Sequence, residues 1–325
     1  MGQEPDRIKK GVDLSAFSLW GGERLIDGEQ AILAGISGGV DSMVLLELLL
    51  RLFTGRIVVC HVNHGLRGEE SDGDEELVRG VAEEKGLRYL RAYGDVNAMA
   101  KNRGVSVELA ARDFRRECFM RWSEECSANV LFLAHHANDQ AETVLFNLCR
   151  GGGARGISPM RKYSENLTVI RPLLECKRSE IVEYARTHQI KWREDSTNAH
   201  PVAARNRLRL EVLPALEDVM QRSVVEKLSQ AARLEESRIL ALREAIEGMN
   251  LLDPQGRLYL PKVLPLGGAL RRTIVHWYLS IKEVSDISFE LVEEVEGILR
   301  SNSSSKVNLP GNKFARRKEK RLIIE

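Results

Sequence analysis

The sequence lacks the cysteine pairs and the long apolar runs that mark several classes of protein. Its five cysteines are scattered and odd in number, and none forms a Cys-x-x-Cys pair, which indicates reduced core thiols rather than a disulfide framework. The longest apolar stretch, 43–52, is too short for a membrane span and carries Glu47 and Arg51. The polar first residues show no secretory signal. We therefore expect a cytoplasmic protein without a membrane partner.

An excess of charge of either sign is also missing. The 325 residues include 48 basic and 47 acidic side chains, so the net charge of +1 predicts no partner by itself. The length is sufficient for two domains, and 43% hydrophobic residues suit a packed protein rather than a disordered one. Local clusters of charge must therefore carry the information about ligands.

A glycine-containing turn, Ile-Ser-Gly-Gly-Val-Asp-Ser at 36–42, joins a predicted strand to a predicted helix. Adjacent glycines allow a tight turn, and the amides at a helix start favour an anion, which indicates a phosphate site. The lysine of the common nucleotide-binding loop is absent from this turn. Asp41 lies inside the turn instead, where Mg²⁺ can bridge its carboxylate to phosphates. A tight turn capped by Asp41 is the alternative. The residues predicted to bind the nucleotide are Ser37, Gly38, Gly39, Val40, Asp41, Ser42 and His64.

Strands and helices alternate through the first half of the chain. The predicted strands lie near 31–36, 56–63, 87–92 and 129–134. This alternation is typical of an α/β fold with a Rossmann-like parallel sheet and helices on both faces. Ligands of such sheets bind at the carboxyl ends of the strands. The turn at 36–42 and the segments 61–67 and 135–143 all follow strands, so we expect them to form one site.

The segment 135–143 is rich in side chains that can carry chemistry. Asp139 and Glu142 are three residues apart at the start of a predicted helix, share one face, and can bind Mg²⁺, a substrate ammonium group, or both. Ordinary acidic residues that match the helix dipole are the alternative. His135 and His136 lack a further ligand at zinc spacing, so we expect one of them to contact phosphate instead.

Basic residues near the predicted site have two interpretations. Arg112, Arg115 and Arg116 share one face of a predicted helix at 105–126, and this face is either simply solvated or has a catalytic or RNA-binding role. Arg155 stands in a glycine-rich segment, which is either a linker or a lid whose arginine meets the substrate.

Taken together, these segments resemble the tRNA(Ile)-lysidine synthase family of ATP pyrophosphatases, which carry a PP-loop. The similarity is carried by SGGVDS (37–42), HVNHGLRG (61–68), AHHANDQAET (134–143), RGGGARGISPM (150–160), IRPLL (170–174), EDSTN (194–198) and RNRLR (205–209). The resemblance implies an enzyme, a carbon–nitrogen ligase, that uses ATP and Mg²⁺ to adenylate carbon 2 of the wobble cytidine in CAU-anticodon tRNA(Ile). The side-chain amine of free L-lysine then displaces AMP and forms lysidine.

The implied reaction suggests roles for individual residues. The expected catalytic residues are Asp41, Asp139, Arg112 and Arg115, the expected Mg²⁺ ligands are Asp41 and Asp139, and the expected lysine-binding pair is Asp139 and Glu142. One carboxylate of this pair would accept the proton of the lysine amine. The chain departs from the family pattern at Asn138, where a second aspartate is usual, and at Arg116, where an aromatic residue is usual.

The pattern changes after residue 216. A long charged helix is predicted at 219–248, followed by a smaller α+β region with a final hairpin that turns at Pro310-Gly311. We therefore expect a catalytic domain at 1–216, a helical linker at 217–249 and a C-terminal tRNA-binding domain at 250–325. The residues expected to contact tRNA phosphates are Arg155, Arg205, Arg207, Arg209, Lys313, Arg316 and Arg317.

Three other functions fit the turn at 36–42. A PP-loop enzyme that thiolates tRNA cytidine needs cysteines for sulfur or an iron–sulfur cluster, and no Cys-x-x-Cys pair is present. A synthetase that amidates GMP or NAD precursors needs no basic platform for RNA. A non-catalytic nucleotide-binding module has little reason to combine Asp41, Asp139 and Glu142, and AMP release separates it from the enzymes. The sequence leaves the oligomeric state open, a homodimer included.

Overall fold

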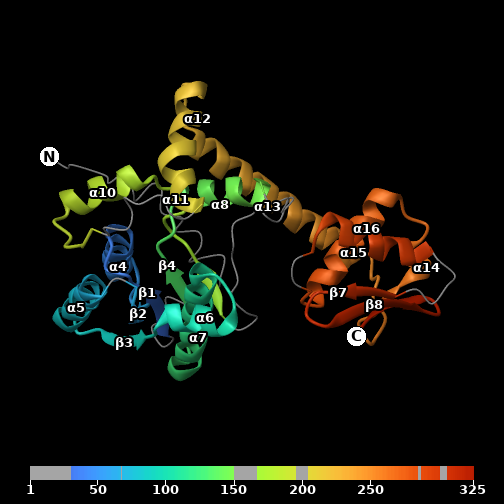
Figure 1. The fold of residues 1–325 in the computed structure, drawn as a ribbon, viewed down its shortest axis with the longest axis horizontal. Helices are drawn as coiled ribbons and strands as arrows, with labels where there is room; N and C mark the ends of the chain where they lie inside the picture. The colour runs from blue at the N-terminus through green and yellow to red at the C-terminus, as the bar shows by residue number, and fades with distance from the viewer. Residues whose placement is uncertain (1–30, 67, 150–166, 195–203, 285–286, 301–305) are drawn as a thin grey trace. The chain divides into compact units, whose positions relative to one another are not determined.

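The computed structural model describes residues 31–66, 68–149, 167–194, 204–284, 287–300 and 306–325. The chain divides into two compact units (Figure 1). The first contains the described residues up to Phe146 and those from 167 to Ala232, and Arg233–Glu325 form most of the second. Within these described ranges, no helix is long and apolar enough to cross a membrane.

A parallel sheet with the strand order β3-β2-β1-β4-β5 forms the centre of the first unit. The strands are β1 (Ala31–Gly35), β2 (Arg56–Asn63), β3 (Arg88–Tyr93), β4 (Val130–Leu133) and β5 (Thr168–Ile170). The four strands predicted from the sequence are confirmed. The edge strand β5 has only 3 residues, too few for a recognisable period.

Helices cover both faces of this sheet, as predicted. One face packs against α4 (Val40–Leu52), α5 (Glu69–Glu84) and α10 (Arg178–Thr187), and the other against α7 (Val107–Cys126), which follows the short α6 (Val96–Arg103) (Figure 1). Alternate residues of β1 serve the two faces, because Ile32 packs with the side chains of α4 and Leu33 with those of α7. The predicted α/β class is therefore confirmed.

The strand order switches direction between β1 and β4. These neighbouring strands lead into α4 and α8 (Ala137–Cys149), respectively. In open α/β sheets such a switch point forms a crevice for ligands at the carboxyl ends of the strands. The turn at 36–42 and the segment 135–143 thus lie at the same edge of the sheet, as expected.

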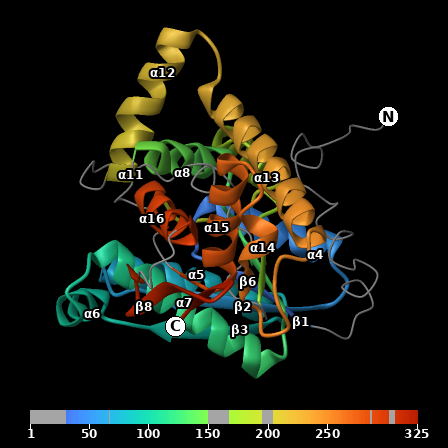
Figure 2. The same cartoon turned by 90° about the vertical axis from the view of Figure 1, so that its right-hand side faces the viewer.

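The long helix predicted at 219–248 is present but begins only at Val224. α12 (Leu213–Met220) ends at Gln221, whose φ of 49° lies in the left-handed region, and α13 is Val224–Gly248. Figure 2 shows the sharp turn between them. Before α12, the short α11 (Ala204–Arg207) runs into a π-helical turn at Leu208–Val212. Such turns are frequent at functional sites.

The second unit is the predicted smaller α+β structure. The helices α14 (Leu260–Val263), α15 (Gly268–Ile281) and α16 (Phe289–Arg300) share a core with an antiparallel sheet of order β6-β9-β8-β7. The strands are β6 (Leu258–Tyr259), β7 (Lys306–Leu309), β8 (Lys313–Lys318) and β9 (Arg321–Ile324). The predicted final hairpin is therefore a three-stranded meander. Its second turn contains Glu319 (φ 54°) and neither glycine nor proline, so the usual turn signal is absent.

Candidate active site

The turn between β1 and α4 is held by its own hydrogen bonds. Ser42 Oγ accepts from the backbone N–H groups of Ser37 (3.1 Å) and Gly38 (3.2 Å) and donates to Gly39 O (2.9 Å). At the first residue of the turn, Ile36 O lies 2.8 Å from Nδ1 of the buried His61 on β2. The predicted phosphate-binding turn is therefore preorganised by residues of the sheet and of α4.

Gly38 occupies a position in this turn that only glycine suits. Its φ is +96°, and a Cβ atom there would lie 3.2 Å from Asp74 Cβ and 3.3 Å from Asp74 O. Arg193 packs against Gly38 and Asp74. Its backbone N–H donates to Gly38 O (3.0 Å), and its side-chain Nε donates to Asp74 Oδ1 (3.1 Å). Residues of α5 and of the segment after α10 therefore pack around the turn.

We expect Gly38→Ala to lower the free energy of unfolding by roughly 1–2 kcal/mol and to weaken nucleotide binding, because alanine is strained in the left-handed region. Gly39→Ala is the matched control. Gly39 has a φ of −74°, and its Cβ would lie 3.6 Å from Ser37 Oγ, an ordinary contact, so its stability should change by less than about 0.5 kcal/mol. Denaturant unfolding of both variants tests this, and equal losses would contradict it.

Asp41 lies in the first turn of α4, and its Oδ1 atom is buried without a hydrogen-bond partner among the described residues. His136 Nε2 lies 3.7 Å away, too far for a hydrogen bond. Burial raises the pKa of Asp41, although His136 and Arg178 act in the opposite direction. In the described part of the chain no three His, Cys, Asp or Glu side chains group into a metal site. Mg²⁺ commonly needs only one or two carboxylates together with phosphates and water, and an unpartnered buried carboxylate oxygen suits it.

His136 connects Asp41 to Asp139. Asp139 Oδ2 accepts the backbone N–H of His136 (3.0 Å), and the backbone N–H of Asp139 donates to His136 Nδ1 (3.4 Å). Because Nδ1 is an acceptor, a neutral imidazole carries its proton on Nε2, the atom that faces Asp41. Burial acts to raise the pKa of Asp139, but the neighbouring histidines and the His136 N–H lower it overall. Asp139 is therefore ionised at neutral pH.

Arg209 brings Asp139 and Glu142 together. Its Nε donates to Glu142 Oε1 (2.6 Å), and its Nη2 donates to Asp139 Oδ1 (3.1 Å) and Glu142 Oε2 (3.2 Å). Burial raises the pKa of Glu142 in spite of the Arg209 hydrogen bond. The structure thus places Arg209, predicted to contact tRNA, on the carboxylates predicted to bind lysine. The π-helical turn before α12 carries this arginine.

His135 belongs to a separate basic group. Arg171 Nε donates to His135 Nδ1 (3.0 Å) from the residue that follows β5. Burial, with the charge of Arg171, lowers the pKa of His135 to about 3, so the ring is neutral at physiological pH. Arg115 contributes to the same lowering, which places this predicted catalytic arginine near His135.

The segment after β2 has mainly structural contacts. Asn63 Nδ2 donates to Asp72 Oδ1 (3.1 Å) and Glu75 Oε2 (3.3 Å), and Asn63 Oδ1 accepts the N–H of Gly65 (3.0 Å). The ring of His64, predicted to bind the nucleotide, packs edge-on against a phenylalanine of α7 with the ring centroids 6.2 Å apart. These contacts fix the backbone that runs beside the turn.

The other predicted arginines have diverse surroundings. Arg112 and Arg116 are exposed on α7. Arg205 lies 3.5 Å from a glutamate of α7, and Arg207 pairs with a glutamate one turn later (3.2 Å). Arg155 and its glycine-rich segment lie outside the described residues.

The basic residues predicted to contact tRNA from the second unit also support its fold. Lys313 Nζ donates to the carbonyl that follows α15 (3.0 Å), and Arg317 Nη1 donates to a carbonyl of α16 (2.8 Å). Arg316 pairs with Glu325 (2.6 Å). These side chains are therefore structural as well as candidate phosphate contacts.

Sequence reasoning missed a pair of contacts between the start of α8 and the residues at and just before the start of α10. Arg178 N–H, at the first residue of α10, donates to Asn138 Oδ1 (3.1 Å), and Ala137 N–H donates to Cys176 O (2.9 Å). The available signal was Asn138 itself, because asparagine commonly accepts hydrogen bonds at helix starts. The asparagine that departs from the family pattern thus has a defined partner.

Comparisons with known proteins identify the family of this chain. Residues 18–216 match a family model described as a PP-loop domain. The tRNA(Ile)-lysidine synthase of Caldanaerobacter subterraneus is 33% identical over 310 residues, which cover 92% of this chain and 66% of that protein. The tRNA(Ile)-lysidine synthase of Chlorobaculum tepidum is 32% identical over 88% of both chains.

Among solved structures, a U34-tRNA thiolase from Methanococcus maripaludis has a TM-score of 0.52 and 19% identity, covering 70% of this chain and 76% of the thiolase. This likeness supports the fold alone. The chain spans less than two thirds of some relatives, such as 44% of the Clostridium tetani protein. The PP-loop match nevertheless covers more than half of the chain, and the Chlorobaculum relative is matched along most of its length. This chain therefore belongs to the tRNA(Ile)-lysidine synthase family of PP-loop proteins.

Proposed function

We propose that this chain synthesises lysidine on tRNA(Ile) in two steps. It first adenylates carbon 2 of the wobble cytidine of a CAU anticodon, and pyrophosphate leaves. The side-chain amine of free L-lysine then displaces AMP. The observation that supports this reaction best is the grouping of a phosphate-binding turn with Asp41, Asp139 and Glu142 at the switch point of one sheet.

The nucleotide is assigned to the turn at 37–42, with Mg²⁺ on Asp41. The buried Oδ1 of Asp41, which lacks a hydrogen-bond partner among the described residues, fits this ion. Bound Mg²⁺ supplies positive charge to the phosphates, including the leaving pyrophosphate. Asp139 fits the metal less well, because its Oδ2 accepts the His136 N–H and its Oδ1 accepts from Arg209. Asp139 is therefore assigned chiefly to the lysine site.

Lysine is assigned to Asp139 and Glu142. The free side-chain amine has a pKa of about 10.4, so the neutral nucleophile costs about 4.6 kcal/mol at pH 7. A carboxylate can hold the ammonium and take its proton as attack begins. The pKa of Glu142 is raised and that of Asp139 is lowered, so Glu142 is the stronger base of the two. Each carboxylate oxygen accepts more than one hydrogen bond, so Arg209 does not exclude the ammonium.

The RNA is assigned to basic residues of both units. Arg112, exposed on α7, and Arg115 near His135 are candidates beside the catalytic turn. The region 250–325 is the proposed tRNA-binding domain, joined to the catalytic region 1–216 through the helical segment 217–249. A tRNA substrate also implies a cytoplasmic site of action.

The test is product analysis with a CAU-anticodon tRNA(Ile) transcript, ATP and Mg²⁺, with and without lysine. We expect pyrophosphate release with this tRNA alone, and AMP release with a lysine-sized mass gain on cytidine only when lysine is added. A tRNA(Ile) transcript with a different wobble base is the matched control and should give neither product. ATP cleavage without tRNA, or no lysine incorporation, would leave only the nucleotide-binding turn of this proposal.

A further inference from the structure

The start of α10 is tied closely to the candidate active site. Arg178, the first residue of α10, donates its N–H to Asn138 Oδ1 (3.1 Å), and Ala137 N–H donates to the carbonyl two residues before Arg178 (2.9 Å). Ala137 and Asn138 directly follow His136, whose Nε2 lies 3.7 Å from Asp41 Oδ1. The backbone of Arg178 is therefore held in place by the same segment that faces Asp41.

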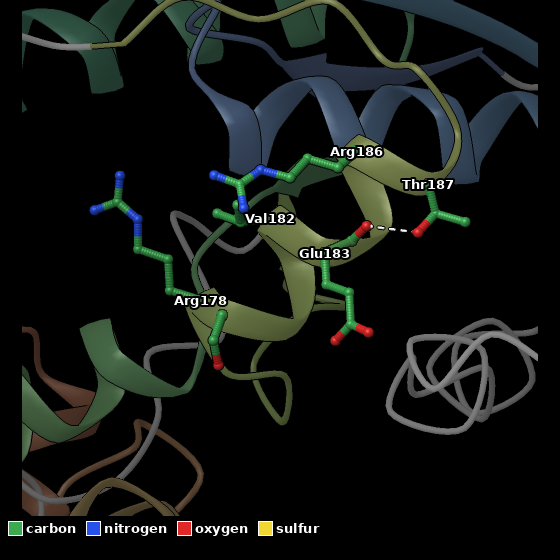
Figure 3. Close-up of a pocket in the computed structure, with 6 residues that line it drawn as sticks. Arg178, Val182, Glu183, Arg186 and Thr187 are labelled. Atoms are coloured by element: carbon green, nitrogen blue, oxygen red, sulfur yellow. Dashed lines mark hydrogen bonds between the residues drawn. The ribbon is translucent and has the colours of Figure 1, made fainter.

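The side chains of α10 form an open depression beside this point. The guanidinium groups of Arg178 and Arg186 extend to the same side of the helix, with Val182 between them, whereas the Glu183 carboxylate points away (Figure 3). These residues, with Ser179 and Thr187, line a depression of about 500 Å³. Among the described residues, Arg178 forms no ion pair with a carboxylate.

The charges around the candidate active site indicate that a ligand of Arg178 would be a phosphate group. Asp41, Asp139 and Glu142 are acidic, and Arg209 already donates to the last two. A bound triphosphate adds more negative charge, which a site must offset with fixed cations where the phosphates leave. Arg178 is the described arginine whose charge acts on Asp41 from α10. A planar guanidinium also matches the geometry of phosphate oxygens.

We propose that Arg178 binds the phosphate groups of ATP that leave as pyrophosphate, and that Asn138 positions Arg178 for this contact. The identity of the nucleotide rests on the proposed function. The asparagine at 138 then has a physical reason: the N–H of Arg178 needs an acceptor oxygen, and the side-chain amide of Asn138 provides one.

Nucleotide binding tests this directly. We expect Arg178→Ala in the full chain to weaken binding of α,β-methylene-ATP with Mg²⁺, measured by calorimetry, and to raise the KM for ATP by a similar factor, roughly tenfold to a hundredfold. Arg186→Ala, on the same face two turns later, is the matched control and should change both by less than twofold. Asn138→Asp should keep binding near the wild-type value, whereas Asn138→Ala should lose part of it.

The outcomes separate this inference from the proposed function. The assignment would be overturned if Arg178→Ala bound the analogue with wild-type affinity. It would also be overturned if Arg178→Ala and Arg186→Ala lost equal affinity, because equal losses would indicate a diffuse basic surface. If Arg178→Ala does not fold, Arg178→Gln carries the same expectations. A wild-type chain that binds the analogue through Arg178 but releases no pyrophosphate with tRNA would overturn the proposed function alone.

Discussion

Replacing Asp41 with asparagine is expected to slow pyrophosphate release about a thousandfold, because the variant loses the negative charge that would hold Mg²⁺ against the phosphates, an effect of several kcal/mol. The fold should survive. Burial raises the pKa of Asp41, so the ionised carboxylate is less favourable in the folded chain than in the unfolded chain. The ionised group therefore lowers the free energy of unfolding at neutral pH. The neutral amide removes that cost, so the midpoint of thermal unfolding should be unchanged or higher.

A matched control separates the effect of the position of Asp41 from the effect of losing one negative charge. Glu69→Gln also removes one negative charge from the first turn of a helix, but Glu69 is exposed at the start of α5. Its rate of pyrophosphate release should stay within about twofold of the wild type. Single-turnover assays at saturating tRNA and several Mg²⁺ concentrations compare the two variants. A rate for Asp41→Asn within tenfold of the wild type would remove Asp41 from the proposed metal site.

Glu142→Gln is expected to lower lysine-dependent AMP release about a hundredfold or more while pyrophosphate release stays within a few-fold, so adenylated tRNA accumulates. The amide cannot accept the proton of the attacking amine. The pH profile gives a second readout. Because burial raises the pKa of Glu142, the wild-type chain should begin to lose the lysine-dependent step on acidification above the ordinary glutamate range. Below that pKa the carboxyl is protonated and cannot act as a base, and the variant should lack this transition.

The free energy of unfolding distinguishes two possible roles of Glu142, recognition of lysine and compensation of the Arg209 charge. Glu142 is 5% exposed and bonds Arg209 at two oxygens. Arg209 is 25% exposed and keeps its bond to Asp139, so Glu142→Gln should lower the free energy of unfolding by about 1–3 kcal/mol. The double variant Glu142→Gln/Arg209→Gln should recover much of that stability without recovering lysine incorporation. Recovery of both would show that Glu142 is needed only to compensate the charge of Arg209, and lysine recognition would then fall to Asp139.

Much of the fold could be predicted, because its signals are local. Alternate residues of β1 face α4 and α7, and this period of two is visible in the sequence. The long helix predicted at 219–248 begins only at Val224, and this later start was missed because Gln221 adopts a left-handed backbone without being glycine. The second turn of the final meander, at Glu319, was missed for the same reason.

Local patterns in the sequence are enough to identify the chemical groups of this protein: the turn at 36–42, the carboxylates Asp139 and Glu142, and the strand ends that bring them to one edge of a sheet. Tertiary structure alone decided their partners. Arg209 is 67 residues from Glu142, and Arg178 is 40 residues from Asn138, so no period of a helix or strand relates the members of either pair. Side chains so far apart in sequence meet only when the packing of α8, α10 and the π-helical turn closes around the site, and that packing depends on the whole core.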